Sequence, residues 1–151
     1  MPHERQQLMQ EFFFHAVAAI EIVAQLVNEA RLLGKSAEVV NPLRVAKALP
    51  VGDPIRSLLA CSYAYPKRDP MPADPYNDAG MIWRLWNYRH QVSHRGRNPF
   101  LFRVGSSPPV SLLVDPRSPG KDPSKKAVQA ELEEILQLVE GRCKAILAHL
   151  P

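Results

Sequence analysis

The chain has 151 residues, a net charge of +4 and 46% hydrophobic residues, which is typical of one soluble folded domain and excludes a disordered chain. The two cysteines, Cys61 and Cys143, form no CxxC pair, so a thiolate zinc cluster is excluded and both are expected in the core of a reduced chain. The N-terminus carries Glu4 and no apolar run, unlike a signal peptide. The apolar stretch 12–27 is shorter than the ~20 residues of a membrane span. We therefore expect a cytoplasmic protein with no membrane partner.

The prolines divide the chain into segments, because proline interrupts the interior of a helix. The blocks 3–41, 76–98 and 124–150 contain none and are predicted to hold three long helices. The first helix should run from about Glu4 to Leu33 and stop at Gly34. Two rows of apolar residues follow its helical spacing: Phe12, Ala16, Ala19, Val23, Leu26, Ala30 and Leu33, and beside them Phe13, Val17, Ile20, Ala24 and Val27. Either this helix is central in its own core, or the second row packs against a second copy of the chain.

The remaining segments complete the predicted fold. Asn41-Pro42 and Asp53-Pro54 should each open a short helix, since each pair places a capping side chain before a proline. The second long helix is predicted to begin with Asp78 as its cap and to end near Gly96, and the third to begin with Ser124 as its cap. Exposed loop is expected over 66–78, and a hairpin of two strands over 100–104 and 110–114. We predict one all-α domain over 1–151, a small up-and-down helical bundle with a short β-hairpin-like excursion.

One stretch of the sequence has an unusual charge pattern. Between Ala79 and Val114 there is no Asp or Glu, while the same stretch holds two histidines, His90 and His94, and five arginines: Arg84, Arg89, Arg95, Arg97 and Arg103. Such a pattern favours an anionic partner, and the forked guanidinium suits phosphate. Alternatively, acidic residues of 124–140 or 4–29 neutralise the stretch in the folded chain.

Helical spacing sets how these side chains can meet. His90 and His94 stack on one face of a helix, with Trp86 one turn earlier. Arg89 belongs to the neighbouring face, with Ile82 and Leu85. Five residues separate Arg89 from His94, so a straight helix would direct them about 140° apart. For both to reach one phosphate, the helix must end or distort near His94, or a second chain must contribute.

Two chemistries could use this arrangement. Two histidines at i and i+4 suit zinc, but the glutamate of the H-E-x-x-H motif and a third ligand are both missing from the sequence around them. Phosphoryl chemistry on RNA needs a histidine to move the proton of a 2′-hydroxyl or a leaving oxygen, and an arginine to hold the phosphate oxygens. It needs neither metal nor cofactor, because the nucleophile belongs to the substrate.

The segment Arg89-His90-Gln91-Val92-Ser93-His94 resembles the R-polar-x-x-x-H signature of the HEPN superfamily, late in an amphipathic helix of a small all-α protein. The surrounding WNYRHQVSHR, the following PFLFRV and VSLLVDPR, and the final long helix are also similar to uncharacterised bacterial HEPN proteins. The resemblance implies a bundle of four to five helices. It also implies a dimeric, metal-independent endoribonuclease that leaves a 2′,3′-cyclic phosphate and a 5′-hydroxyl, in toxin–antitoxin, defence or RNA-processing systems. By position, His94 is then the catalytic histidine, Arg89 stabilises the phosphate, and His90 assists.

The expected partners follow from this interpretation. RNA or a nucleotide should bind, and the candidate contacts around the catalytic residues are Arg84, Tyr88, Arg95, Arg97 and Arg103. A homodimer is expected, and an antitoxin or a nucleotidyltransferase is a further candidate partner. The alternative is a non-catalytic helical module that binds a nucleotide or a partner protein, in which Arg89 and His94 form an anion site.

Overall fold

The computed structural model describes residues 2–74, 76–95, 100–103, 110–113 and 128–151. Within them five α-helices form: α1 (Pro2–Ala30), α2 (Pro42–Ala48), α3 (Pro54–Ala60), α4 (Asp78–Arg95) and α5 (Val128–Leu147). A 3₁₀ turn covers Ala37–Val39. Two strands, β1 (Phe100–Arg103) and β2 (Val110–Leu113), pair antiparallel with Phe100 opposite Leu113. The predicted all-α class is therefore confirmed.

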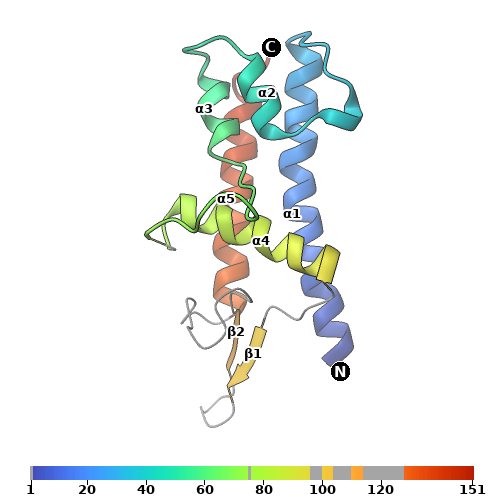
Figure 1. The fold of residues 1–151 in the computed structure, drawn as a ribbon, viewed down its shortest axis with the longest axis vertical. Coiled ribbons are helices and arrows are strands. Elements are labelled where there is room, and N and C mark those ends of the chain that lie inside the picture. The colour runs from blue at the N-terminus through green and yellow to red at the C-terminus, as the bar shows by residue number, and fades with distance from the viewer. Residues whose placement is uncertain (1, 75, 96–99, 104–109, 114–127) are drawn as a thin grey trace.

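The two long helices α1 and α5 lie side by side, α4 crosses them, and α2 and α3 cover one end (Figure 1). Both long helices run in the same direction, because the Arg31 guanidinium just beyond α1 donates to the carbonyl of His149 just beyond α5 (3.2 Å). An up-down-up order also makes the first and third long helices parallel, so the shared direction of α1 and α5 does not contradict the predicted bundle. The difference is α4, which crosses the two long helices instead of running antiparallel beside them (Figure 1). Short connections force neighbouring helices to run antiparallel, whereas here the long segment between α1 and α5, with α4 across it, returns the chain to its starting end.

The caps that open the helices are set locally. Asn41 Oδ1 accepts the N–H of Arg44 (2.8 Å) and Asp53 Oδ1 accepts that of Ile55 (2.9 Å), as the sequence predicts. The cap of α4 is one residue earlier than predicted, because Asn77 Oδ1 accepts the N–H of Gly80 (2.8 Å). Asp78 lies instead in the first turn of α4. The predicted Ser124 cap and Gly96 stop lie outside the described residues.

The core consists of two clusters that share α1 and α5. The first joins the N-terminal half of α1 to α4 and α5, and the second joins the C-terminal half of α1 to α2, α3 and the end of α5. The second apolar row of α1 is at most 1% exposed: Phe13, Val17, Ile20, Ala24 and Val27. This row therefore packs within its own chain, which decides between the two interpretations of α1. Cys143 is half-buried against both clusters, but Cys61 is exposed, contrary to expectation.

By length and composition, one helix among the described residues could cross a membrane, the 24-residue stretch Gln7–Ala30 of α1. The apolar segment is therefore longer than the sequence analysis expects. Its buried row lies in the core of the folded chain, which accounts for those apolar residues without a membrane. The exposed Leu8, Ile22 and Leu26 remain on the outer face of the helix.

The end of α1 is set by a leucine rather than by the expected Gly34. Leu32 has a φ of 52°, and the N–H groups of Leu33 and Leu32 donate to the carbonyls of Asn28 (2.9 Å) and Glu29 (3.1 Å). These two hydrogen bonds define a Schellman motif, in which the residue of positive φ is usually glycine. The buried Asn28 side chain holds the following turn, because it bonds both the N–H and the carbonyl of Lys35 (3.0 and 2.8 Å).

Replacing Leu32 by glycine should stabilise the protein by about 0.5–1 kcal/mol, because relief of the left-handed strain outweighs the added freedom of the unfolded chain. The Leu32 side chain is 90% exposed, so little packing is lost. Urea denaturation measures the gain. Val51→Gly is the matched control, because Val51 is 89% exposed and has no positive φ. A loss of stability in Leu32→Gly would contradict this account.

Candidate functional site

Helix α4 carries the predicted motif, and two indole hydrogen bonds fix it to the segment that follows α3. Trp83 Nε1 donates to the carbonyl of Asp69 (3.0 Å), and Trp86 Nε1 donates to that of Ser62 (3.0 Å). Both tryptophans are buried, in agreement with the expectation that they belong to the core rather than to an exposed stacking surface. These two hydrogen bonds hold α4 against the segment 62–69, and so fix the position of the helix that carries Arg89 and His90.

Arg89 lies on α4, half-buried against α1. Its guanidinium carbon is 5.6 Å from the centre of the Phe14 ring, a cation–π distance. The Phe14 ring is 44% exposed, so this contact lies at the edge of the core. The predicted partly inward placement of Arg89 is confirmed, since the residue is half-buried and its guanidinium Nε atom is buried.

His90 is half-buried and lies one helical turn after Trp86. The helix continues through His94 to Arg95, so His90 and His94 are related by one regular turn. The same regularity keeps Arg89 and His94 about 140° apart around the axis. Because the helix does not end before His94, a single chain does not bring these two backbone positions to one side.

Two of the predicted nucleic-acid contacts are buried. Arg84 is 1% exposed, pairs with Glu131 of α5 (2.6 Å) and lies over the Tyr76 ring (5.2 Å). Tyr88 is 0% exposed and packs on Phe13 at 5.0 Å between ring centres. Neither side chain can meet an RNA strand in this structure. The charge of Arg84 is neutralised by Glu131 of the last helix, as the alternative interpretation of the basic stretch predicts.

The other predicted contacts lie at the end of α4 and beyond it. Arg95 is the last residue of α4, and Arg103 is the last residue of β1, paired with Val110. The structure describes the backbone of these two and of His94, but not their side chains. Arg97 lies outside the described residues.

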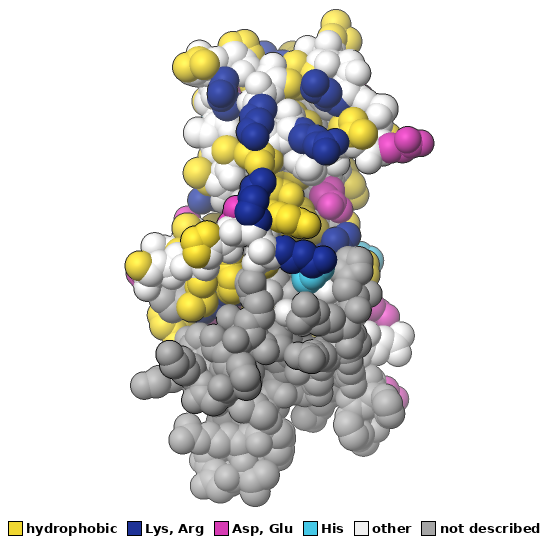
Figure 2. All heavy atoms as spheres, in the orientation of Figure 1, with side chains coloured by type: hydrophobic (Ala, Val, Ile, Leu, Met, Phe, Trp, Pro, Cys, Tyr) yellow, Lys and Arg dark blue, Asp and Glu magenta, His cyan; other side chains and the backbone are white. Residues whose placement is uncertain are grey.

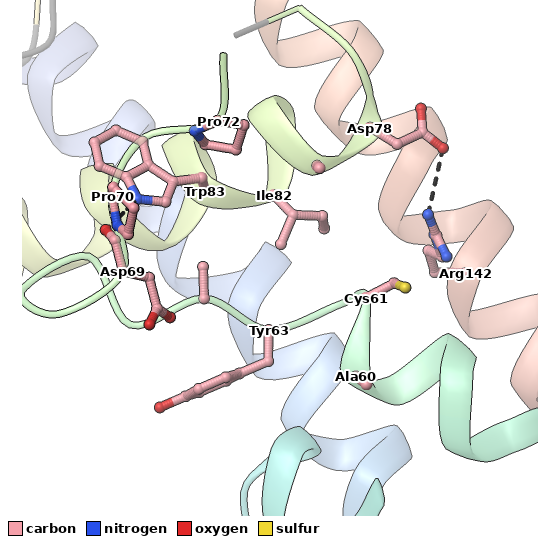
Figure 3. Close-up of a pocket in the computed structure, with 12 residues that line it drawn as sticks. Ala60, Cys61, Tyr63, Asp69, Pro70, Pro72, Asp78, Ile82, Trp83 and Arg142 are labelled. Carbon is pink, nitrogen blue, oxygen red and sulfur yellow. Dashed lines mark hydrogen bonds and ion pairs between the residues drawn. The ribbon is translucent and has the colours of Figure 1, made fainter. Parts of the chain in front are cut away.

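A pocket of about 390 Å³ opens beside the N-terminal half of α4. Figure 3 shows Trp83 beside Pro70 and Pro72 at one end, and the ion pair of Asp78 with Arg142 (3.3 Å) at the other. From the sequence, the residues 66–78 that form part of this pocket's wall are expected only as an exposed loop. The close spacing of Pro70 and Pro72 is the sequence signal for a rigid pocket wall.

Two ionisable groups beside this pocket have shifted pKa values. Burial raises the pKa of Tyr63, against the opposing effect of the nearby Arg68 and Arg44 cations. The backbone N–H of Tyr65, which donates to Asp69 Oδ2 (2.8 Å), and the Arg68 guanidinium lower the pKa of Asp69. The ionised Asp69 carboxylate therefore stabilises the turn over residues 65–69.

Among the described side chains, no three His, Cys, Asp or Glu residues gather closely enough to hold a metal ion. The His94 side chain is not among them, so a metal site formed by His90 and His94 is an alternative that the EDTA experiment below tests. Comparison of the chain with protein-family models, with curated proteins and with solved structures finds no match.

Proposed function

We propose that this chain is a metal-independent endoribonuclease of HEPN type, which acts as a homodimer with a HEPN-like fold. The observation that carries the proposal is the Arg89-His90 pair of α4, beside the buried Trp86, with His94 one regular turn further along the same helix. Arginine and histidine at the edge of a helical core supply an anion clamp and a proton carrier. These are the two functions that cleavage of RNA through its own 2′-hydroxyl requires.

The reaction is an internal transfer of the phosphoryl group. One histidine takes the proton of the 2′-hydroxyl, the 2′-oxygen attacks the adjacent phosphorus, and the bond from phosphorus to the 5′-oxygen breaks. The leaving oxygen receives a proton, which gives a 2′,3′-cyclic phosphate and a 5′-hydroxyl end. Arg89 stabilises the charge that builds on the non-bridging oxygens, and His94 moves the proton with His90 in support.

We infer a dimer because α4 is a regular helix through both Arg89 and His94. With Arg89 and His94 about 140° apart on one chain, a site that uses both is completed by the α4 of a second copy. The exposed Leu8, Ile22 and Leu26 of α1 supply apolar surface for such an assembly. An antitoxin or a nucleotidyltransferase is proposed as a further partner of the same surface, and the protein is placed in the cytoplasm.

The same geometry favours a second candidate function. A lone chain with Arg89 packed on Phe14 has an anion site but no assembled acid–base pair. It would then bind a nucleotide or a partner protein without cleaving RNA. Light scattering at tens of micromolar distinguishes the two, because a monomer contradicts the composite catalytic site.

Purified protein incubated with end-labelled RNA in EDTA should cleave it at the same rate as without chelator. The rate should not change because neither the nucleophile nor the proton carrier needs a metal, and the products should carry 2′,3′-cyclic phosphate ends because the substrate's own 2′-oxygen attacks the phosphorus. Denaturing gels, with phosphatase treatment of the product ends, provide the measurement. Activity that disappears in EDTA would replace this mechanism with the metal site of His90 and His94, and absence of cleavage under both conditions would support the binding module.

A further inference from the structure

Basic side chains gather on the face of the molecule shown in Figure 2, over α2 and the segment between α3 and α4. The exposed cations of these segments are Arg44, Lys47, Lys67 and Arg68. The acids nearby are occupied: Asp53 caps α3 and Asp69 holds the turn at Tyr65. Asp69 also pairs with Arg68 (3.1 Å), and its side chain is 38% exposed. The segment 40–69 holds five Lys and Arg against two Asp, so it keeps an excess of positive charge.

Three of these cations have no carboxylate partner within the described part of the chain. Arg44 donates to the backbone carbonyl of Val39 (3.2 Å), and neither Arg44, Lys47 nor Lys67 forms an ion pair with a described acid. Arg44 and Lys47 are three residues apart on α2, so their side chains are neighbours on its surface. A surface cation without a partner is free to bind phosphate.

An exposed aromatic residue lies beside one of these cations. The Tyr65 ring is 43% exposed, and the Arg68 guanidinium carbon is 5.7 Å from its centre. Burial has the larger effect on the pKa of Tyr63 and raises it, whereas the Arg68 and Arg44 cations both lower it. Basic side chains interleaved with accessible rings are typical of proteins that bind single strands, because unpaired bases stack on the rings while cations hold the backbone.

The segment after α3 also contacts α4, the helix that carries Arg89 and His90. The Tyr63 ring packs edge-on against Trp86, with ring centres 4.9 Å apart, and His90 follows one turn later on α4. A strand that lies over Arg44 and Tyr65 is therefore guided toward the side of α4 that carries His90.

We propose that Arg44, Lys47, Lys67 and Arg68, together with the ring of Tyr65, form a track that binds single-stranded RNA. The direction of the track toward Arg89 and His90 as the point of cleavage rests on the proposed function, whereas binding by the track itself does not. The track supplies affinity and prefers single strands, and the motif residues supply the chemistry.

The test is the binding of a fluorescent single-stranded RNA of about 12 nucleotides, 2′-O-methylated so that it cannot be cleaved. The variant Arg44→Gln/Lys47→Gln/Lys67→Gln should weaken binding roughly 10- to 100-fold at low salt. It should also lower the slope of log affinity against log salt by about 2, since ~0.7 counterion is released for each phosphate neutralised on a single strand. For single changes, Lys47→Glu should weaken binding. Lys144→Glu, which reverses an exposed charge on α5, should change it less than about twofold.

Each result decides the proposal. Unchanged binding in the triple variant, equal loss in Lys144→Glu, or equal affinity for an RNA duplex or for poly-glutamate in place of RNA would overturn it. The last outcome would indicate an acidic protein partner. Because the probe is not cleavable, loss of binding in the triple variant together with absence of cleavage by the wild type would reject the proposed ribonuclease and keep the track.

Discussion

Replacing His94 by alanine is expected to lower the rate of RNA cleavage by roughly 10²- to 10⁴-fold, the usual contribution of a general acid or base. The melting temperature should change little, because a histidine in the last turn of a helix contributes at most about 1–2 kcal/mol through the helix dipole. Single-turnover cleavage and thermal unfolding of the same preparations measure both effects. Wild-type cleavage by His94→Ala would show that the catalytic assignment is wrong.

Two neighbouring variants separate the roles within the motif. Arg89→Ala should impair cleavage and also lower stability, since its stem packs and its guanidinium lies over Phe14. His90→Ala should give a smaller kinetic loss than His94→Ala, because it assists rather than transfers the proton.

Mixing the two inactive variants tests whether the site is shared between copies. If Arg89 of one copy acts with His94 of the other, heterodimers of Arg89→Ala and His94→Ala keep one intact site. Random exchange makes half of the dimers heterodimers, so the mixture should regain about a quarter of wild-type activity. Recovery would not occur if both residues of a site came from the same chain.

The largest expected effect on stability comes from the buried pair of Arg84 with Glu131. Glu131→Leu leaves the guanidinium buried without its counter-charge and should cost about 3–5 kcal/mol of unfolding free energy. The double variant Arg84→Met/Glu131→Leu should recover most of that loss, since two apolar side chains of similar volume replace the pair. Urea denaturation of the three proteins measures both changes.

An exposed pair on the same helix serves as the control. Lys144 and Glu140 lie at the same distance (2.6 Å), and the Lys144 hydrogen bond lowers the pKa of Glu140. Because solvent screens this pair, Glu140→Leu should leave stability almost unchanged. Equal losses in Glu131→Leu and Glu140→Leu would contradict the account of the buried pair.

The features that sequence predicted well are those decided within a few residues. Asn41 and Asp53 cap their helices because a capping side chain needs only the next turn. The same reasoning predicts Asp78 as the cap of α4, which is wrong by one residue. Asp and Asn cap helices equally well, and only the observed bond from the Gly80 N–H identifies Asn77 as the cap. The positive φ of Leu32 was missed because Asn28 and the backbone of Lys35 impose it, against the intrinsic preference of leucine.

Long-range contacts account for the other differences. Periodicity placed Arg89 at the margin of the core, but Arg84 meets Glu131 only after the chain has returned through α4 to α5. The crossing of α4 over α1 and α5 (Figure 1) depends on the same long-range packing, which local patterns do not encode. The cations of the proposed track lie in two separate segments of the sequence, α2 and the residues after α3, and local patterns do not show that both segments face the same side of the molecule (Figure 2).

The attachment of α4 through its two indoles has a spectroscopic consequence. The chain contains two tryptophans, and both donate to carbonyls of the segment that follows α3. All of its tryptophan emission therefore originates at the junction between the motif helix and the proposed RNA track. A shift in that emission reports movement at this one place, so occupancy of the track can be followed in the unlabelled protein.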